Sequence, residues 1–117
     1  MVIRQGEVYW VELDEPKGSE PGYRHPFVIV QNDAFNKSNI NTVVACMLTS
    51  NAKLASSPGN ILLSKGDANL SKASVVNVTQ ILTLNKSDLK QKIGQLQKEK
   101  INQIIDGIEY LLKPRVV

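Results

Sequence analysis

Two pairs of neighbouring side chains in this sequence are suited to acid–base and phosphate chemistry. The first is Arg24 and His25, and His25 is the only histidine among the 117 residues. An imidazole can take up or return a proton near neutral pH, and a guanidinium can bind a phosphate through two hydrogen bonds. The second pair, Thr49 and Ser50, supplies hydroxyl groups. Together these groups would suit the chemistry of phosphate esters, which needs a base, an acid and an anion-binding group.

Both pairs stand at predicted strand ends. The first pair marks the point where a loop rich in Gly, Pro and Ser gives way to an apolar run, and this change predicts a strand over residues 26–31. The second pair closes another apolar run, which predicts a strand over residues 41–50. If the two strands are antiparallel neighbours, the start of one lies beside the end of the other, and the two pairs meet.

The same residues also have ordinary explanations. An arginine–histidine pair before a proline is often a solvated loop end, and Thr and Ser at strand ends often satisfy backbone groups in turns. Cys46 lies within an apolar run, where nothing would lower the pKa of its thiol. We therefore interpret Cys46 as a small buried hydrophobic residue and not as a nucleophile.

The pattern along the chain predicts short strands followed by one helix. Strand-like segments rich in β-branched and aromatic residues, bounded by turn residues, cover residues 6–13, 26–31, 41–50, 59–63 and 73–84. After Asn85 the apolar residues follow a helical period and stop before Pro114; they are Ile101, Ile104, Ile105, Ile108, Leu111 and Leu112. This order favours a mainly β fold, a small and strongly curved antiparallel barrel with a C-terminal amphipathic helix, as a single domain over residues 1–117.

Two further expectations concern side-chain direction. Strict alternation along the last predicted strand would place Val76, Val78, Gln80 and Leu82 on one face. In the polar connection after residue 31, Phe35 is expected to point inward.

Composition and motifs exclude several classes of protein. The sequence has no P-loop, no dinucleotide fingerprint and no nucleophile elbow, so we expect no cofactor. One histidine and one distant cysteine do not favour a metal site. The net charge of +3 permits a basic face without requiring one. No segment has the length of a membrane helix and the first residues lack the apolar run of a signal peptide, so we expect a cytoplasmic protein that does not enter a membrane.

Several separated motifs resemble the MazF/PemK family of toxin endoribonucleases. The motifs are at residues 4–9, 18–20, 26–33, 48–51, 74–76 and 80–81. The resemblance covers essentially the whole chain and implies an SH3-like barrel with a C-terminal helix that forms a homodimer. It also implies cleavage of single-stranded RNA without metal, leaving a 2′,3′-cyclic phosphate and a 5′-hydroxyl. A further implication is an antitoxin partner with a disordered acidic segment that occupies the RNA groove.

The resemblance also implies roles for individual residues. The family's catalytic threonine corresponds to Thr49, but the position of its catalytic arginine, directly before the proline, holds His25, with Arg24 one place earlier. Two arrangements are open: His25 as the acid–base group with Arg24 clamping phosphate, which we favour, or Arg24 turned in as the principal group. Candidate RNA contacts are Ser19, Glu20, Ser50, Lys53, Ser74 and Gln80.

Two alternatives stay within the same fold. Relatives of this barrel poison DNA gyrase by binding it without catalysis, and the presence of Arg24, His25 and Thr49 argues against that function here. The other alternative is an RNA-binding module that has kept the groove and lost turnover.

Overall fold

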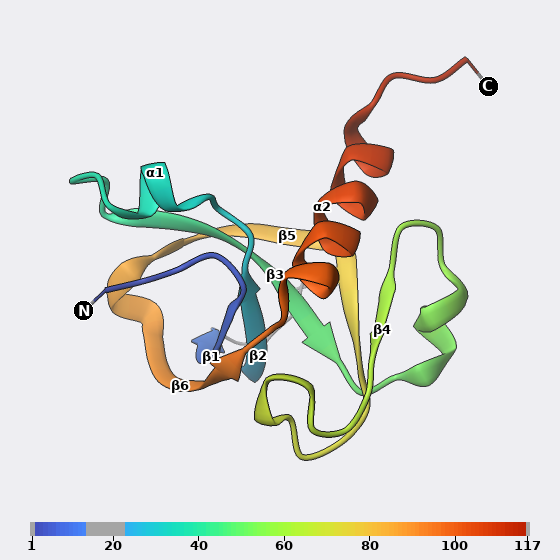
Figure 1. The fold of residues 1–117 in the computed structure, drawn as a ribbon, viewed down its shortest axis with the longest axis horizontal. Helices are drawn as coiled ribbons and strands as arrows, with labels where there is room; N and C mark the ends of the chain where they lie inside the picture. Colours follow the sequence, from blue (N-terminus) through green and yellow to red (C-terminus); the bar gives the residue numbers. More distant parts are fainter. Residues whose placement is uncertain (1, 14–22, 117) are drawn as a thin grey trace.

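The computed structural model describes residues 2–13 and 23–116, which form one curved antiparallel sheet crossed by a helix (Figure 1). The strands are β1 (Glu7–Leu13), β2 (Tyr23–Ile29), β3 (Thr42–Thr49), β4 (Ile61–Leu63), β5 (Ser74–Asn85) and β6 (Leu89–Gln95). Their order in the sheet is β4-β5-β3-β2-β1-β6. The helices are α1 (Asp33–Asn36) and α2 (Lys98–Leu112), and the 3-10 turns are η1 (Ala52–Ser56), η2 (Asp67–Asn69) and η3 (Lys86–Asp88).

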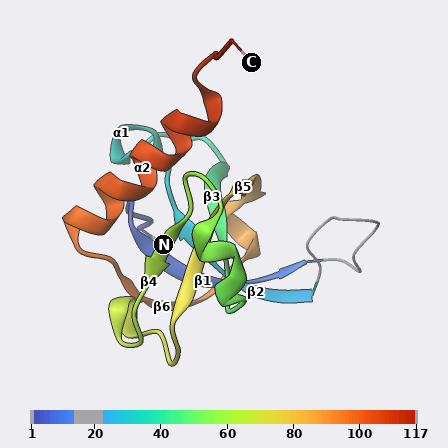
Figure 2. The same ribbon diagram turned by 90° about the vertical axis from the view of Figure 1, so that its right-hand side faces the viewer.

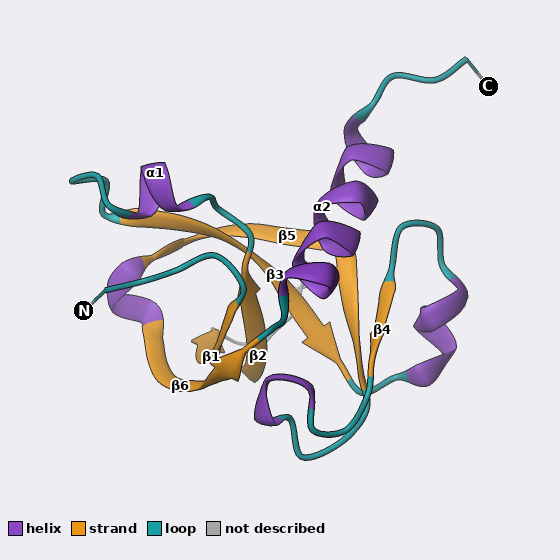
Figure 3. Cartoon of the chain, viewed as in Figure 1, coloured by secondary structure: helices purple, strands orange, loops and turns teal. Residues whose placement is uncertain are grey.

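The sheet curls because a very short connection joins β5, near one edge of the sheet, to β6, at the other edge. The three-residue turn η3 leads from the end of β5 directly into β6, which pairs with β1 on the other side of the sheet (Figure 3). One face of the curled sheet, here called the inner face, therefore encloses a hydrophobic cluster. Its buried members are Ile3, Tyr9, Val11, Phe27, Ile29, Val43, Ala45, Met47, Leu84 and Leu89. This is the predicted barrel with a C-terminal helix.

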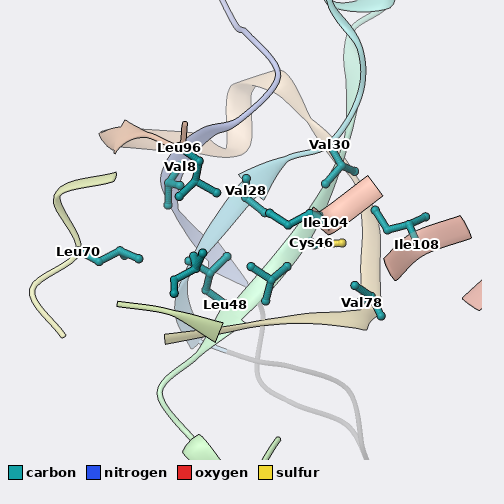
Figure 4. Packing of buried hydrophobic residues seen from close by; sticks show 12 residues of the cluster. Val8, Val28, Val30, Cys46, Leu48, Leu70, Val78, Leu96, Ile104 and Ile108 are labelled. Atoms are coloured by element: carbon teal, nitrogen blue, oxygen red, sulfur yellow. The ribbon is translucent and has the colours of Figure 1, made fainter. Parts of the chain in front are cut away.

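The opposite face of the sheet, here called the helix face, packs against α2. It carries a second cluster that includes Val8, Val28 and Cys46 from the strands and Ile104 and Ile108 from α2 (Figure 4). Burying such aliphatic side chains stabilises the fold by about 1.5–3 kcal/mol each. As expected, Cys46 is fully buried, and desolvation raises the pKa of its thiol to about 12.

The helix α2 approaches the sheet closely at one glycine. A Cβ atom added to Gly107 would lie 2.1 Å from the carbonyl oxygen of Gly59, so a larger residue would force the helix outward. Beyond this point the helix extends past the sheet, and Leu111 and Leu112 are 40% and 68% exposed. The predicted apolar stripe is therefore buried along its first part only.

The strand β5 bends sharply, which breaks the predicted alternation. Cys46 pairs with Ile81 and Leu48 pairs with Val76, so four residues of β5 lie opposite a single residue of β3. After the bend, Ile81 packs in the same cluster as Val76, while Leu82 lies against the inner cluster. The prediction that Leu82 shares a face with Val76 is wrong, because the extra residues shift the side-chain period.

Three local predictions also need correction. Residues 2–13 and 23–116 contain six strands and not five, because the prediction missed β6. β2 begins at Tyr23, three residues before the predicted start. Phe35 is 53% exposed, and the buried residue of α1 is Asn36, whose side-chain amide donates to the carbonyl of Gln31 at 2.8 Å. A hydrogen-bonded polar side chain has taken the inward position expected for the phenylalanine.

Candidate functional site

The candidate site lies at the end of the β1–β2 hairpin. The pairing of β1 with β6 runs as far as Val11, and the pairing of β2 with β3 runs as far as Phe27. Beyond these points the two strands pair with each other up to Leu13 and Tyr23. Figure 2 shows this end of the hairpin extending to one side of the molecule. Both faces of the hairpin can therefore present side chains to a ligand.

His25 is directed toward the inner face of the sheet. It pairs with Val11, which is fully buried in the inner cluster, and it precedes Phe27 of the same cluster by two residues. Alternate residues of a strand share a face. His25 itself is half-buried, so its ring lies at the mouth of the barrel where the inner face meets solvent.

Thr49 belongs to the same face as His25. Phe27 pairs with Met47, and continuing this antiparallel register by two residues sets His25 opposite Thr49. The β2–β3 ladder stops at Phe27, before this point, because the next residue, Pro26, has no N–H to donate to a ladder. The register thus sets His25, from the first predicted pair, beside Thr49, from the second.

The hydroxyl of Thr49 is held by the turn that follows β3. The backbone N–H of Asn51 donates to Thr49 Oγ1 at 3.2 Å, and the Asn51 side chain accepts a hydrogen bond from the N–H of Lys53, also at 3.2 Å. Because Oγ1 is the acceptor in its bond, the hydroxyl proton of Thr49 can still be donated to a ligand. The turn thus fixes the oxygen of Thr49 and leaves its proton available.

Arg24 is directed toward the opposite face. It pairs with Glu12, and its guanidinium carbon lies 4.4 Å from the centroid of the Trp10 ring. Such stacking on an indole is attractive and keeps the N–H edges of the guanidinium accessible. Arg24 and His25 therefore point to opposite faces of the hairpin, and the structure does not bring Arg24 into contact with the face that carries Thr49.

The other predicted contacts are spread over the structure. Ser50 and Lys53 are exposed just beyond β3, and Gln80 is half-buried at the bend of β5. Ser74 is 5% exposed, and its hydroxyl donates to the carbonyl of Lys72 at 3.2 Å. It shares the helix face with Val76, so its placement does not favour an RNA contact. Ser19 and Glu20 lie outside the described residues.

Two aromatic residues of the hairpin were not among the sequence candidates. In the sequence Trp10 indicates only a strand. Its contact with Arg24 depends on the cross-strand register, which cannot be read from the sequence. Tyr23 is 63% exposed and lies two residues before His25. Its position directly before the Arg24–His25 pair was the available signal.

At the start of β1, away from the hairpin end, the buried carboxylate of Glu7 links β1 to β6. Glu7, 3% exposed, accepts hydrogen bonds from the Tyr9 hydroxyl at 3.1 Å and the backbone N–H of Arg4 at 2.6 Å. Lys92 Nζ lies 2.5 Å from the other carboxylate oxygen. Burial, reinforced by the charge of Glu7, raises the pKa of Tyr9 to about 12, so Tyr9 remains a hydrogen-bond donor.

The described residues contain no group of three or more His, Cys, Asp or Glu side chains placed to hold a metal ion. Among the helices of the described chain, none combines the length and apolar character needed to cross a membrane.

Comparison with known proteins gives consistent results at the level of sequence and fold. Residues 4–112 match the family model of the PemK-like, MazF-like toxin of type II toxin-antitoxin systems. The chain is 41% identical over 112 residues to the endoribonuclease MazF6 of Mycobacterium tuberculosis, covering 96% of this chain and 98% of the relative.

Solved structures show the same architecture. An endoribonuclease from a mycobacterial species, solved in complex with its cognate antitoxin, superimposes with a TM-score of 0.73 at 26% identity, covering 99% of this chain and 98% of that one. MazF from Deinococcus radiodurans gives a TM-score of 0.78 at 23% identity, covering 97% of this chain and 99% of that one, and so supports the fold alone.

Proposed function

This chain belongs to the PemK-like, MazF-like toxin family of type II toxin–antitoxin systems, and on that basis we propose that it is an endoribonuclease that cleaves single-stranded RNA by attack of the 2′-hydroxyl on the adjacent phosphate. The products are a 2′,3′-cyclic phosphate and a 5′-hydroxyl. Because RNA supplies its own nucleophile, the protein needs to provide a base, an acid and donors for the phosphate, and no metal is required.

The observation that carries this proposal is the shared face of His25 and Thr49 at the mouth of the barrel. His25 accepts the proton of the 2′-hydroxyl as the 2′-oxygen forms its bond to phosphorus. The bond from phosphorus to the 5′-oxygen breaks, and the 5′-oxygen takes up a proton. Water at this exposed mouth can carry the proton from the imidazolium to the leaving oxygen, so the proton count is unchanged.

Thr49 supplies a hydrogen bond to the phosphate. Its oxygen is fixed by the N–H of Asn51, which leaves its proton for a non-bridging oxygen that gains charge during the reaction. Arg24 acts from the helix face, where its stacked guanidinium binds a phosphate of the same strand away from the scissile bond. This arrangement supports His25 as the acid–base group and gives Arg24 a binding role.

Two partners follow from the family. We propose that an antitoxin with a flexible acidic segment covers the site and competes with RNA for its cationic and donor groups, and that the active form is a homodimer. The related mycobacterial endoribonuclease was solved with its cognate antitoxin. The exposed Leu111 and Leu112 at the end of α2 suit contact with a second copy of the chain.

The test is to incubate the purified protein with a long RNA in excess chelator and to analyse the ends of the fragments. We expect defined fragments with cyclic phosphate and 5′-hydroxyl ends, and no cut where the 2′-hydroxyl next to the cleavage site is replaced by hydrogen. Retention of RNA without cutting would instead indicate a binding module, and inhibition of DNA gyrase without RNA cleavage would indicate a gyrase toxin.

A further inference from the structure

Tyr23 is an exposed aromatic side chain at the end of the hairpin that carries the candidate site. It pairs with Leu13 in the last pair of β1 and β2, and 63% of its surface is exposed. Most tyrosines bury a large part of their ring, because the ring is apolar. The exposure of this ring is therefore unusual for a tyrosine.

The backbone of Tyr23 adds a second observation. Its φ angle is +61°, in the left-handed region that non-glycine residues occupy at a cost of about 1–2 kcal/mol. Glycine would adopt this conformation without that cost. Strained backbone conformations of this kind cluster at active sites and ligand sites, and here one coincides with an exposed aromatic ring.

Tyr23 and His25 lie on the same face of the hairpin. They are two residues apart on β2 and pair with Leu13 and Val11, which are also two residues apart on β1. At about 3.3 Å per residue, their Cα atoms are about 7 Å apart along the strand. A ring at this distance can contact the base of a nucleotide whose phosphate lies at the imidazole.

The other described aromatic side chains with exposed surface are differently placed. Trp10 is half-buried, and the guanidinium of Arg24 covers its ring on the helix face. The ring of Tyr110 is covered by Arg115, 4.1 Å from its centroid, and Phe35 belongs to α1, beyond the other end of β2. Among these rings, Tyr23 combines an exposed position with the face of His25.

We propose that Tyr23 is a substrate-positioning residue that stacks on one nucleobase beside the scissile phosphate. This inference rests on the proposed ribonuclease function and adds the residue that holds the strand in place. Aromatic side chains stack on any base, because every base has a π-face. Stacking would fix one nucleotide next to His25, so that the 2′-hydroxyl and phosphate are held at the imidazole and at Thr49.

The experiment measures binding of a short RNA whose cleavage-site 2′-hydroxyl is replaced by hydrogen, so that it cannot be cut. Removing the ring in Tyr23→Ala should weaken binding about 5- to 100-fold. Tyr23→Phe should bind as the wild type does, because it keeps the ring. Tyr23→Gly should bind as weakly as Tyr23→Ala while unfolding at the same or a higher temperature, because glycine suits the positive φ. Phe35→Ala, another exposed aromatic truncation, should bind normally.

Removing bases one at a time from the same RNA gives the decisive result. At one position beside the cleavage site, an abasic nucleotide should weaken binding to the wild-type protein as much as Tyr23→Ala does. Tyr23→Ala should bind this abasic RNA as tightly as it binds intact RNA, because the stacking contact between ring and base is already absent in the variant.

Contrary outcomes separate this inference from the proposed function. A wild-type protein that neither binds nor cuts RNA would overturn both. A wild-type protein that cuts RNA, together with Tyr23→Ala that binds RNA equally well, would overturn the stacking role alone. If Tyr23→Ala bound RNA normally and lost affinity only for an acidic antitoxin peptide, the stacking role would also be overturned, and Tyr23 would instead contact the antitoxin.

Discussion

The two faces of the β1–β2 hairpin present adjacent residues in different surroundings. On the inner face, His25 lies at the mouth of the barrel next to the buried inner cluster, with Thr49 on the neighbouring strand. On the helix face, Arg24 stacks on Trp10 and faces Glu12 across the hairpin. Two residues that look like one site in the sequence thus serve two surfaces, because successive side chains of a strand point in opposite directions.

This difference suggests a division of labour. A proton-transfer group must be held within a few tenths of an ångström of the reacting atoms, and the buried neighbours Val11 and Phe27 suit the role that we propose for His25. A group that binds phosphate away from the reaction tolerates more movement. The stacked guanidinium of Arg24 suits that second task.

The largest effect is expected from removing the imidazole on the inner face. His25→Ala should lower the cleavage rate by roughly 10²-fold or more, because proton transfer loses its acid–base group. The measurement is the initial rate on a fluorogenic RNA, with the unfolding temperature as a check on folding. Near-normal activity in a folded His25→Ala protein would contradict the proposed role of His25, since the inner face would then not be the reactive one.

The exchange of the two residues sharpens this test. The double variant Arg24→His with His25→Arg moves a guanidinium to the inner face and the imidazole to the helix face. If the inner face must carry the proton-transfer group, this variant should be about as inactive as His25→Ala, because a guanidinium stays protonated near neutral pH and cannot act as the base. A double variant with the wild-type pH profile would show that the imidazole works from either face.

A smaller loss is expected from Thr49. Replacing its hydroxyl by a methyl group in Thr49→Val should reduce the cleavage rate about 10- to 100-fold, the usual value of a hydrogen bond to a charged group. Thr49→Ser keeps the donor and is the matched control, expected to retain most of the activity. Equal rates for Thr49→Val and wild type would assign Thr49 to the turn alone, through its bond with Asn51.

Arg24→Ala should have a weaker effect of a different kind. We expect a several-fold higher KM with little change in kcat, because a phosphate contact away from the reaction contributes to binding. The logarithm of RNA affinity should also fall less steeply with the logarithm of salt concentration, by about 0.7 for one lost phosphate contact on a single strand. A drop in kcat as large as that of His25→Ala would place the guanidinium at the reacting phosphate and contradict the assignment of faces.

The smallest effect concerns the far end of β2. The backbone N–H of Gln5 and the Asn36 amide donate to the carboxylate of Asp33, and these bonds lower its pKa. The charged form is therefore favoured in the folded state, so its stabilising contribution is present above the unfolded pKa of about 4 and is lost as the pH falls through the folded value.

Urea unfolding at several pH values checks this contribution. Wild type should lose more stability between pH 5 and pH 3 than Asp33→Asn, which has no charge to lose. Activity of Asp33→Asn near pH 7 should match that of the wild type, because this residue is remote from the hairpin end. An unchanged pH dependence of stability would show that the carboxylate contributes nothing.

Several elements could be predicted because their pattern is local. β1, β3 and β5 have dense runs of β-branched residues, and α2 repeats apolar residues at helical spacing, so each element is encoded in its own sequence. β6 was missed because residues 89–95 are mostly polar, as suits a strand at the sheet edge, and its strand conformation depends on pairing with β1. The bend in β5 was missed for a related reason, since extra residues are visible only against the partner strand.

By itself the sequence determined the class of the fold, the family and the residues able to move a proton or bind a phosphate, because residue type and short-range spacing carry that information. The tertiary structure decided which of these residues share a surface. Only the register of β2 with its two neighbours sets His25 with Thr49 on the inner face and Arg24 with Trp10 on the other. The physical reason is that a strand's side chains alternate locally, whereas the side on which each one finds its partners depends on residues distant in the chain.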